Sequence, residues 1–217
     1  MYKNIFFDLD GTLTDPGVGI TNSVAYALKK LGIDVHSRES LYKFIGPPLR
    51  VSFEEFYGFD DNKSELGVKY YREYYTDKGI FENEVYPNIP DLLEALKNNG
   101  RTIILATSKP EIFAERILEH FNLSRYFDCI CGSSLDKTRT TKSDVISYAL
   151  KTADITSTES CIMIGDREHD IFGAKANNLR SVGVLYGYGS EDELRTAGAD
   201  YIVSSVDKIK NFLLKEI

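Results

Sequence analysis

The 217-residue sequence lacks any apolar run approaching the roughly 20 residues that a membrane-spanning helix needs. Residues 1–30 also lack a basic segment followed by an apolar one, because Asp8, Asp10 and Asp15 interrupt them. No secretory signal is therefore predicted. We expect a cytoplasmic protein that has no membrane as a partner.

Cysteine and positive charge are also scarce. The three cysteines, Cys129, Cys131 and Cys161, do not make a disulfide framework, and a Cys-x-Cys pair alone does not supply the four ligands of a structural zinc site. Lys and Arg number 26 against 33 Asp and Glu, which gives a net charge of −7. This charge disfavours a nucleic acid polymer as a partner, and an anionic substrate would need a locally positive site.

Apolar residues make up 42% of the chain, which is enough for a substantial core. Short apolar runs predict buried parallel strands at 3–7, 102–106, 129–131, 160–164, 181–184 and 200–203. From residue 84 onward these runs alternate with amphipathic helical patterns. The alternation predicts an α/β fold with a Rossmann-like three-layer core, in which helices cover both faces of a parallel sheet.

Residues 16–83 have helical patterns with no convincing strand between them. We therefore predict two domains: a core of residues 1–15 and 84–217, and an all-helical domain of residues 16–83 inserted after the first strand. Four tyrosines of the insertion share a helical spacing, namely Tyr70, Tyr71, Tyr74 and Tyr75. We expect them to pack inside a small bundle, and the alternative is a surface that stacks on substrate.

Polar residues follow three of the predicted strands, at the ends where parallel α/β sheets form their sites. They are Asp8 and Asp10 after the first strand, Thr107 and Ser108 after the second, and Gly165, Asp166 and Asp170 after the fourth. Lys142 stands at the start of a predicted helix. Each piece alone is weak, but together four separate segments deliver acids, hydroxyls and a base to the same edge.

The first two acids suggest what they bind. Asp8 and Asp10 are two residues apart, which on an extended strand places them on one face, roughly 7 Å from each other. Gly11 lets the chain turn immediately afterward, and Asp166 comes from another strand. Three carboxylates repel one another unless a cation lies between them. An all-oxygen ligand set suits Mg²⁺, which binds one or two carboxylates together with a substrate phosphate.

These residues match a known family. The segment DLDGTLTD (residues 8–15) resembles the first motif of the haloacid dehalogenase-type phosphohydrolases, and GDREHD (165–170) resembles the fourth. Thr107 resembles the second motif and Lys142 the third. The resemblance covers essentially the whole chain, including a helical cap after the first strand. IGPPL and YPNIPDLLEAL are most similar to the phosphoglycolate phosphatase group, whereas GDREHDIFGAKANN followed by GVLYGYGS is similar to members described as 5′-nucleotidases.

The resemblance implies a role for each motif. Asp8 would be the nucleophile that takes the phosphoryl group, and Asp10 would be the general acid and then the general base. The phosphoryl oxygens would be held by Thr107, Ser108, Lys142 and the backbone of the turn at Gly11. Mg²⁺ would be held by Asp8, the carbonyl of Asp10, and Asp166. Asp170 would support the site through water or by orienting its neighbours.

Several alternatives to these roles stay open in the sequence. Lys109 and Lys137 compete with Lys142 for the third motif. Arg50 is a candidate for a contact from the cap to the substrate, and a surface ion pair is its alternative. His169 is a weaker candidate for a proton carrier inside the loop of the fourth motif. An acid at position 10 argues against a haloalkanoate dehalogenase.

The predicted function is a Mg²⁺-dependent phosphatase that hydrolyses small phosphate monoesters, of the phosphoglycolate or nucleoside 5′-monophosphate type, through an aspartyl phosphate. A sugar phosphomutase shares every core motif and is the alternative within the family. A phospho-accepting signalling receiver is the alternative from another class, because receivers also combine aspartates at strand ends with a Thr or Ser and a Lys. The expected partner is a small phosphorylated metabolite, and the expected state is a monomer or a homodimer.

Overall fold

The computed structural model describes residues 1–136 and 138–214. The chain divides into two compact units, one of Met1–Thr14 with Val85–Ile217 and one of Asp15–Glu84, which we call the core unit and the helical unit. The domain boundaries predicted from the sequence differ from this division by one residue at each crossing. In the described part of the chain, no helix combines the length and the apolar character needed to span a membrane.

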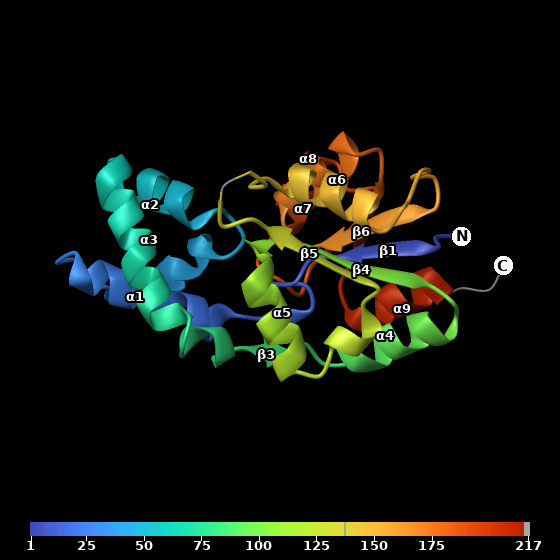
Figure 1. Cartoon of the computed structure of the whole chain (residues 1–217), viewed down its shortest axis with the longest axis horizontal. Coiled ribbons are helices and arrows are strands. Elements are labelled where there is room, and N and C mark those ends of the chain that lie inside the picture. The colour runs from blue at the N-terminus through green and yellow to red at the C-terminus, as the bar shows by residue number, and fades with distance from the viewer. Residues whose placement is uncertain (137, 215–217) are drawn as a thin grey trace. The chain divides into compact units, whose positions relative to one another are not determined.

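The core unit is built on one parallel sheet (Figure 1). Its strands in sheet order are β5 (Cys129–Ser133), β4 (Thr102–Pro110), β1 (Asn4–Phe7), β6 (Cys161–Gly165), β7 (Arg180–Val184) and β8 (Tyr201–Val203). These six strands confirm the predicted α/β class. The largest difference in length is in β4, which continues to Pro110 where the sequence predicted an end at residue 106. Its pairing with β5 shifts register between Ala106 and Pro110.

Helices cover both faces of this sheet (Figure 1). They are α4 (Ile89–Asn98), α5 (Glu111–His120), α6 (Lys142–Thr152), α7 (Glu168–Ala176), α8 (Glu191–Ala197) and α9 (Val206–Leu214). The start of α6 has a strong local signal: Thr141 accepts a hydrogen bond from the N–H of Asp144, whose side chain accepts from Thr141 in return. This capping box fixes where the helix begins, and hence where Lys142 lies.

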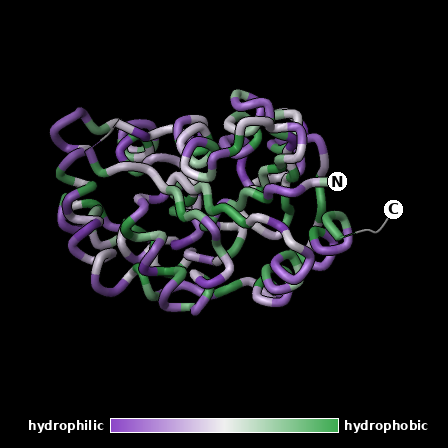
Figure 2. The backbone as a smooth tube through the Cα atoms, turned by 45° about the vertical axis from the view of Figure 1, so that its right-hand side comes forward, coloured by the Kyte–Doolittle hydropathy of each residue, from purple (hydrophilic) through white to green (hydrophobic). Residues whose placement is uncertain are grey.

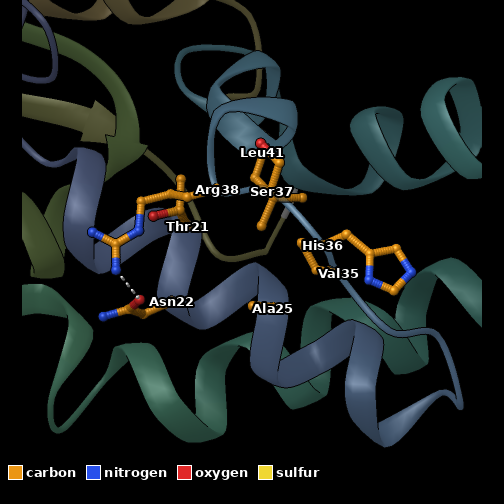
Figure 3. A pocket seen from close by; sticks show the side chains of 8 residues that line it. All are labelled: Thr21, Asn22, Ala25, Val35, His36, Ser37, Arg38 and Leu41. Atoms are coloured by element: carbon orange, nitrogen blue, oxygen red, sulfur yellow. Dashed lines mark hydrogen bonds between the residues drawn. The ribbon is translucent and has the colours of Figure 1, made fainter.

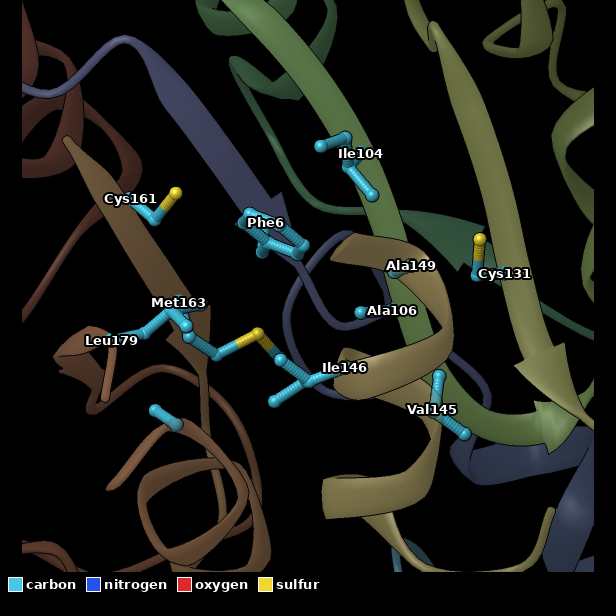
Figure 4. Packing of buried hydrophobic residues seen from close by; sticks show 11 residues of the cluster. Phe6, Ile104, Ala106, Cys131, Val145, Ile146, Ala149, Cys161, Met163 and Leu179 are labelled. Carbon is cyan, nitrogen blue, oxygen red and sulfur yellow. The ribbon is translucent and has the colours of Figure 1, made fainter. Parts of the chain in front are cut away.

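One cluster of the hydrophobic core lies between the sheet and α6. Figure 4 shows Phe6 of β1, Met163 of β6 and Ile146 of α6 pointing into one cluster, and all three are fully buried. Every residue of β1 and of β6 is buried, and along the whole backbone hydrophobic and hydrophilic stretches alternate (Figure 2). The strands are therefore buried on both faces, as parallel strands under two helical layers are expected to be.

The helical unit contains α1 (Gly17–Lys30), α2 (Leu49–Tyr57), α3 (Asp61–Tyr75) and two short 3₁₀ helices, η1 (Glu39–Phe44) and η2 (Gly79–Phe81). Tyr71 and Tyr75 are buried and stack with ring centroids 5.0 Å apart, as expected for packing residues. Tyr70 and Tyr74, for which the same role was predicted, are only half-buried. The segments that connect the two units, β2 (Thr14–Asp15) and β3 (Glu84–Val85), pair as a two-stranded sheet.

The backbone of α1 approaches η2 closely at Gly19. Its N–H donates to Glu82 O at 2.9 Å, and a Cβ at this position would lie 1.9 Å from Gly79 O. Gly19→Ala therefore forces the two segments apart, and we expect a loss of about 3 kcal/mol in the free energy of unfolding. Urea denaturation measures this loss. The control is Val18→Ala in the same helix, whose side chain is 47% exposed; equal stabilities of the two variants would contradict the prediction.

Candidate active site

Asp8 follows the central strand of the sheet directly. Because β1 pairs with β4 on one side and β6 on the other, its carboxyl end lies in the middle of the sheet edge. The N–H of Asp8 continues the ladder by donating to Ile164 O at 2.9 Å. The chain then turns, and Leu9 O accepts from the N–H groups of Leu13 and Thr14 at 2.9 and 3.0 Å. This turn places Asp8 and Asp10 at the mouth of the strand.

Gly11 is required by this turn in two ways. Its φ angle is +81°, a backbone conformation that favours glycine, and a Cβ would lie 2.2 Å from Asp166 Oδ2. Its N–H donates to Thr14 O at 2.8 Å. The sequence predicted a phosphate contact for Gly11, whereas in the structure this N–H closes the loop.

Three carboxylates meet at this edge. Oxygen atoms of Asp8, Asp166 and Asp170 all lie within 4.8 Å of one another, and all three side chains are buried. Asp166 follows β6, and Asp170 lies in the first turn of α7 because that helix begins at Glu168. The structure thus brings Asp170 into the acid cluster itself, while the side chain of Asp10 lies outside the cluster.

Asp166 has one oxygen with a partner and one without. Its Oδ2 accepts from the N–H of Tyr188 at 2.7 Å, whereas its buried Oδ1 has no hydrogen-bond partner. Burial raises the pKa of Asp166 well above its ordinary value, and the charges of Asp170 and Asp8 raise it further. Burial also raises the pKa of Asp170 to about 6, although Lys142 opposes that shift.

Lys142 lies between two of these acids. Its Nζ is 2.7 Å from Asp8 Oδ1 and 2.8 Å from Asp170 Oδ1, and it donates to Ala106 O at 3.1 Å. The two carboxylate contacts are ion pairs by distance, because neither oxygen receives a well-aligned hydrogen bond. Burial alone lowers the pKa of Lys142, but Asp170 and Asp8 outweigh it and the pKa is raised. The ammonium group is therefore a fixed positive charge beside Asp8.

Asp10 has a different cation as its partner. Lys109 Nζ lies 2.7 Å from Asp10 Oδ2, and the two side chains are 6% and 13% exposed. The other oxygen, Oδ1, is buried without a hydrogen-bond partner. Burial raises the pKa of Asp10, and Lys109 opposes the shift. Of the two alternatives to Lys142, Lys109 thus pairs with Asp10, while Lys137 lies outside the described residues.

The two predicted hydroxyl residues lie within β4, where the sequence had placed them after the strand. Thr107 is 1% exposed, and its Oγ1 accepts from the N–H of Lys109 at 3.2 Å. Ser108 is half-buried. Lys142 reaches Ala106 O next to Thr107, so its ammonium group and the hydroxyl-bearing end of β4 share one edge.

Sequence reasoning gave no role to the loop after β7. Tyr188 supplies an N–H to Asp166, and Tyr186 donates its hydroxyl to Thr12 O at 2.9 Å. Burial, and then the charge of Asp166, raises the pKa of Tyr186, so the phenol stays protonated as a donor. Sites in parallel sheets form at the carboxyl ends of the strands. The loop after β7 also begins at such an end, so the same rule could have identified it.

Two weaker candidates have other surroundings. The guanidinium nitrogens of Arg50 in α2 lie 2.8, 2.9 and 3.4 Å from carboxylate oxygens of Glu54, Asp61 and Glu65. Arg50 thus forms the ion pairs that were the predicted alternative to a substrate contact. His169 lies in the first turn of α7, not in a loop. Burial lowers its pKa, as does the charge of Arg167.

The helical unit has a cavity of about 210 Å³ that contains none of the predicted site residues (Figure 3). It is lined by Thr21, Asn22, Ala25, Val35, His36, Ser37, Arg38 and Leu41. Arg38 Nη2 donates to Asn22 Oδ1 at 3.2 Å along its rim. The guanidinium group thus already has a partner inside the unit.

The core edge fits a divalent cation by charge and by ligand type. Its buried or nearly buried ionisable groups are the carboxyls of Asp8, Asp10, Asp166 and Asp170 and the ammonium groups of Lys109 and Lys142. Four negative charges against two positive ones leave two negative charges when all are ionised. The donors are all oxygen, and Asp166 Oδ1 has no partner. These are the properties of a Mg²⁺ site.

A model of the family described as haloacid dehalogenase-like hydrolase matches residues 5–184. The chain belongs to this family. As a haloacid dehalogenase-like hydrolase it is a phosphatase, a phosphoric monoester hydrolase, as the sequence predicted. The signalling receiver considered as an alternative is therefore wrong.

Named relatives support the same placement. The chain is 51% identical over 194 residues to a protein of Pseudomonas aeruginosa named 5′-nucleotidase, covering 89% of this chain and 87% of that protein. It is 33% identical to a phosphoglycolate phosphatase of Aquifex aeolicus, covering 85% of each. The crystal structure of a predicted phosphatase from Clostridium acetobutylicum superposes with a TM-score of 0.95 at 52% identity, and the match covers 99% of both chains.

Proposed function

We propose that this phosphatase hydrolyses small phosphate monoesters with the help of Mg²⁺, through an aspartyl phosphate on Asp8. The observation that carries the proposal is the position of Asp8, at the end of the central strand with its Oδ1 2.7 Å from the buried ammonium group of Lys142. A carboxylate so placed lies beside a buried positive charge at the centre of the sheet edge. It is therefore suited to attack a phosphorus atom.

The chemistry takes two displacements. First, an oxygen of Asp8 attacks phosphorus and the bond from phosphorus to the ester oxygen breaks. Asp10 gives a proton to that leaving oxygen. Then water attacks the phosphorus atom of the aspartyl phosphate and gives a proton back to Asp10, and the bond to Asp8 breaks to release inorganic phosphate. Asp10 Oδ1, which has no partner in the structure, is the oxygen that we assign to both proton transfers.

The charge that develops on the phosphoryl oxygens needs donors around it. We assign this role to the ammonium group of Lys142, helped by the hydroxyls of Thr107 and Ser108 at the end of β4. Gly11 contributes by shaping the loop, since its N–H is already bonded to Thr14.

Mg²⁺ would be held by side chains of Asp8 and Asp166 and by the carbonyl of Asp10, with Asp170 orienting the cluster. When bound, it would neutralise the charge of the acids and of the phosphate. Burial raises the pKa values of Asp166 and Asp170, and the charge of Asp8 raises both further, so a cation among these acids would stabilise their charged forms.

Metal removal is the first test. We expect activity in excess EDTA to fall by about two orders of magnitude, because the acid cluster then repels the incoming phosphate. Mg²⁺ should restore the rate, Mn²⁺ or Co²⁺ should replace it, and Ca²⁺ should support little turnover because its coordination is larger and looser. Phosphate release measures each rate, and full activity in chelator would contradict the proposed metal role.

The substrate is tested by a panel of phosphate monoesters assayed with Mg²⁺ at neutral pH. We propose nucleoside 5′-monophosphates and phosphoglycolate as the leading classes, on the strength of the 5′-nucleotidase and phosphoglycolate phosphatase relatives. A phosphomutase would isomerise a sugar phosphate with little net release of phosphate. A cytoplasmic location and a monomeric or homodimeric state stay predictions of the sequence.

A further inference from the structure

The two carboxylate oxygens of Asp10 have different surroundings. Oδ2 lies 2.7 Å from Lys109 Nζ, whereas Oδ1 is buried and has no hydrogen-bond partner. Both side chains are largely shielded from water, at 6% exposed for Lys109 and 13% for Asp10. Water therefore screens this ion pair little, and it restricts the rotation of the carboxylate. The oxygen that stays available for a ligand is Oδ1.

An irregularity in β4 sets the position of Lys109. The register of β4 against β5 shifts between Ala106 and Pro110, and Lys109 donates its N–H to Thr107 Oγ1 at 3.2 Å. Irregularities of this kind re-aim a side chain relative to a regular strand. The neighbouring strand also comes close, since a Cβ on Gly132 would lie 2.6 Å from Lys109 O. The backbone that carries Lys109 is thus held from two sides.

Lys109 and Lys142 form ion pairs with different acids of the sheet edge. Lys142 contacts Asp8 and Asp170, which belong to the acid cluster. Lys109 contacts Asp10, which lies outside it. The two ammonium groups thus contact different acids, and the contact of Lys109 bears on the orientation of Asp10.

We propose that Lys109 is a positioning residue for the proton transfers of Asp10. It holds Oδ2 so that Oδ1 faces the ester oxygen in the first displacement and the water in the second. Lys109 transfers no proton or phosphoryl group itself. The inference rests on the proposed function, in which Asp10 protonates the leaving oxygen as its bond to phosphorus breaks.

The test uses the different needs of two leaving groups. An alkyl ester such as a nucleoside 5′-monophosphate requires a proton on its leaving oxygen, whereas p-nitrophenolate leaves readily without one. In Lys109→Met we expect the first-turnover rate of alcohol release from the alkyl ester to fall about 10- to 100-fold. The first-turnover release of p-nitrophenol should stay within about threefold of the parent rate.

Two further variants serve as a control and as a conservative replacement. Lys97→Met removes another lysine of the core unit, which forms an ion pair of 2.8 Å with Asp128 but is 34% exposed, and should change neither rate. Lys109→Arg keeps a cation with a different reach and should restore part of the alkyl-ester rate. If Lys109→Met does not fold, Lys109→Arg decides, because its alkyl-ester rate should then fall more than its aryl-ester rate.

The outcomes separate the two proposals. If Lys109→Met loses rate equally on both esters, or on neither, the proposed role of Lys109 is overturned. The proposed function still stands in that case, provided that the parent enzyme forms an aspartyl phosphate. A parent enzyme that releases no phosphate from either ester and carries no phosphate on Asp8 overturns both.

Discussion

Replacing Asp8 by asparagine is expected to lower kcat by about 10⁵-fold or more, the scale of loss seen when a catalytic nucleophile is removed. The amide is a very poor nucleophile, and its oxygen carries no charge for Mg²⁺ or Lys142. The side chain keeps its shape, and loss of one charge relieves repulsion with Asp166 and Asp170. We therefore expect the variant to fold, with a melting temperature close to that of the parent.

The measurement is phosphate release over long incubation, together with mass spectrometry of the protein after rapid quench. Asp91→Asn is the matched control, because Asp91 is an exposed carboxylate at the start of α4 in the same unit. It should retain the parent rate. Phosphorylated protein in the Asp8→Asn variant would show that the nucleophile is another residue.

Asp10→Asn is expected to have the second largest effect, with a different signature. General acid–base groups contribute about 10² to 10⁴ in rate, or roughly 3 to 5 kcal/mol at 1.36 kcal/mol per tenfold. The nucleophile remains, so esters with good leaving groups should still phosphorylate Asp8. The amide takes no proton from the attacking water, so the aspartyl phosphate should accumulate.

Rapid quench and mass spectrometry should therefore find phosphate trapped on Asp8 in Asp10→Asn and very little in the parent at the same time point. The exposed Asp91→Asn variant again serves as the control. An Asp10→Asn enzyme that keeps turnover within about tenfold of the parent would sink the assignment of Asp10. A nearby group such as His169 would then have to supply the proton.

Most of the candidate site residues can be predicted from the sequence by a single rule about the ends of parallel strands. Buried apolar runs identify parallel strands, and the polar residues at their carboxyl ends must meet at one edge. Asp8 and Asp166 are located by this rule alone, and the structure places them together. Lys142 is located by the start of a helix whose capping residues, Thr141 and Asp144, are visible in the sequence.

The pairing of side chains could not be predicted in the same way. Lys109 reaches Asp10 because β4 continues irregularly past Ala106, and the sequence pattern gives no signal for that shift. Asp170 joins the acid cluster because α7 begins at Glu168, two residues after Asp166. Arg50 binds Asp61 and Glu65 of the next helix, and the contact depends on how α2 packs on α3.

The order of the strands also has a consequence for biosynthesis. Asp8 is among the first residues to be translated, but β1 pairs with strands that begin about 100 and about 160 residues later in the chain. At typical elongation rates of about 5 to 20 residues per second, β1 waits roughly 8 to 30 s for β6 and for Asp166. Before β4 is translated, Ile5, Phe6 and Phe7, which are fully buried in the finished protein, have no neighbouring strand to pair with, and the side of β1 that pairs with β6 stays open for the whole interval. One side of the strand that carries Asp8 therefore stays unpaired until β6 has been translated, and the acid cluster is assembled late in synthesis.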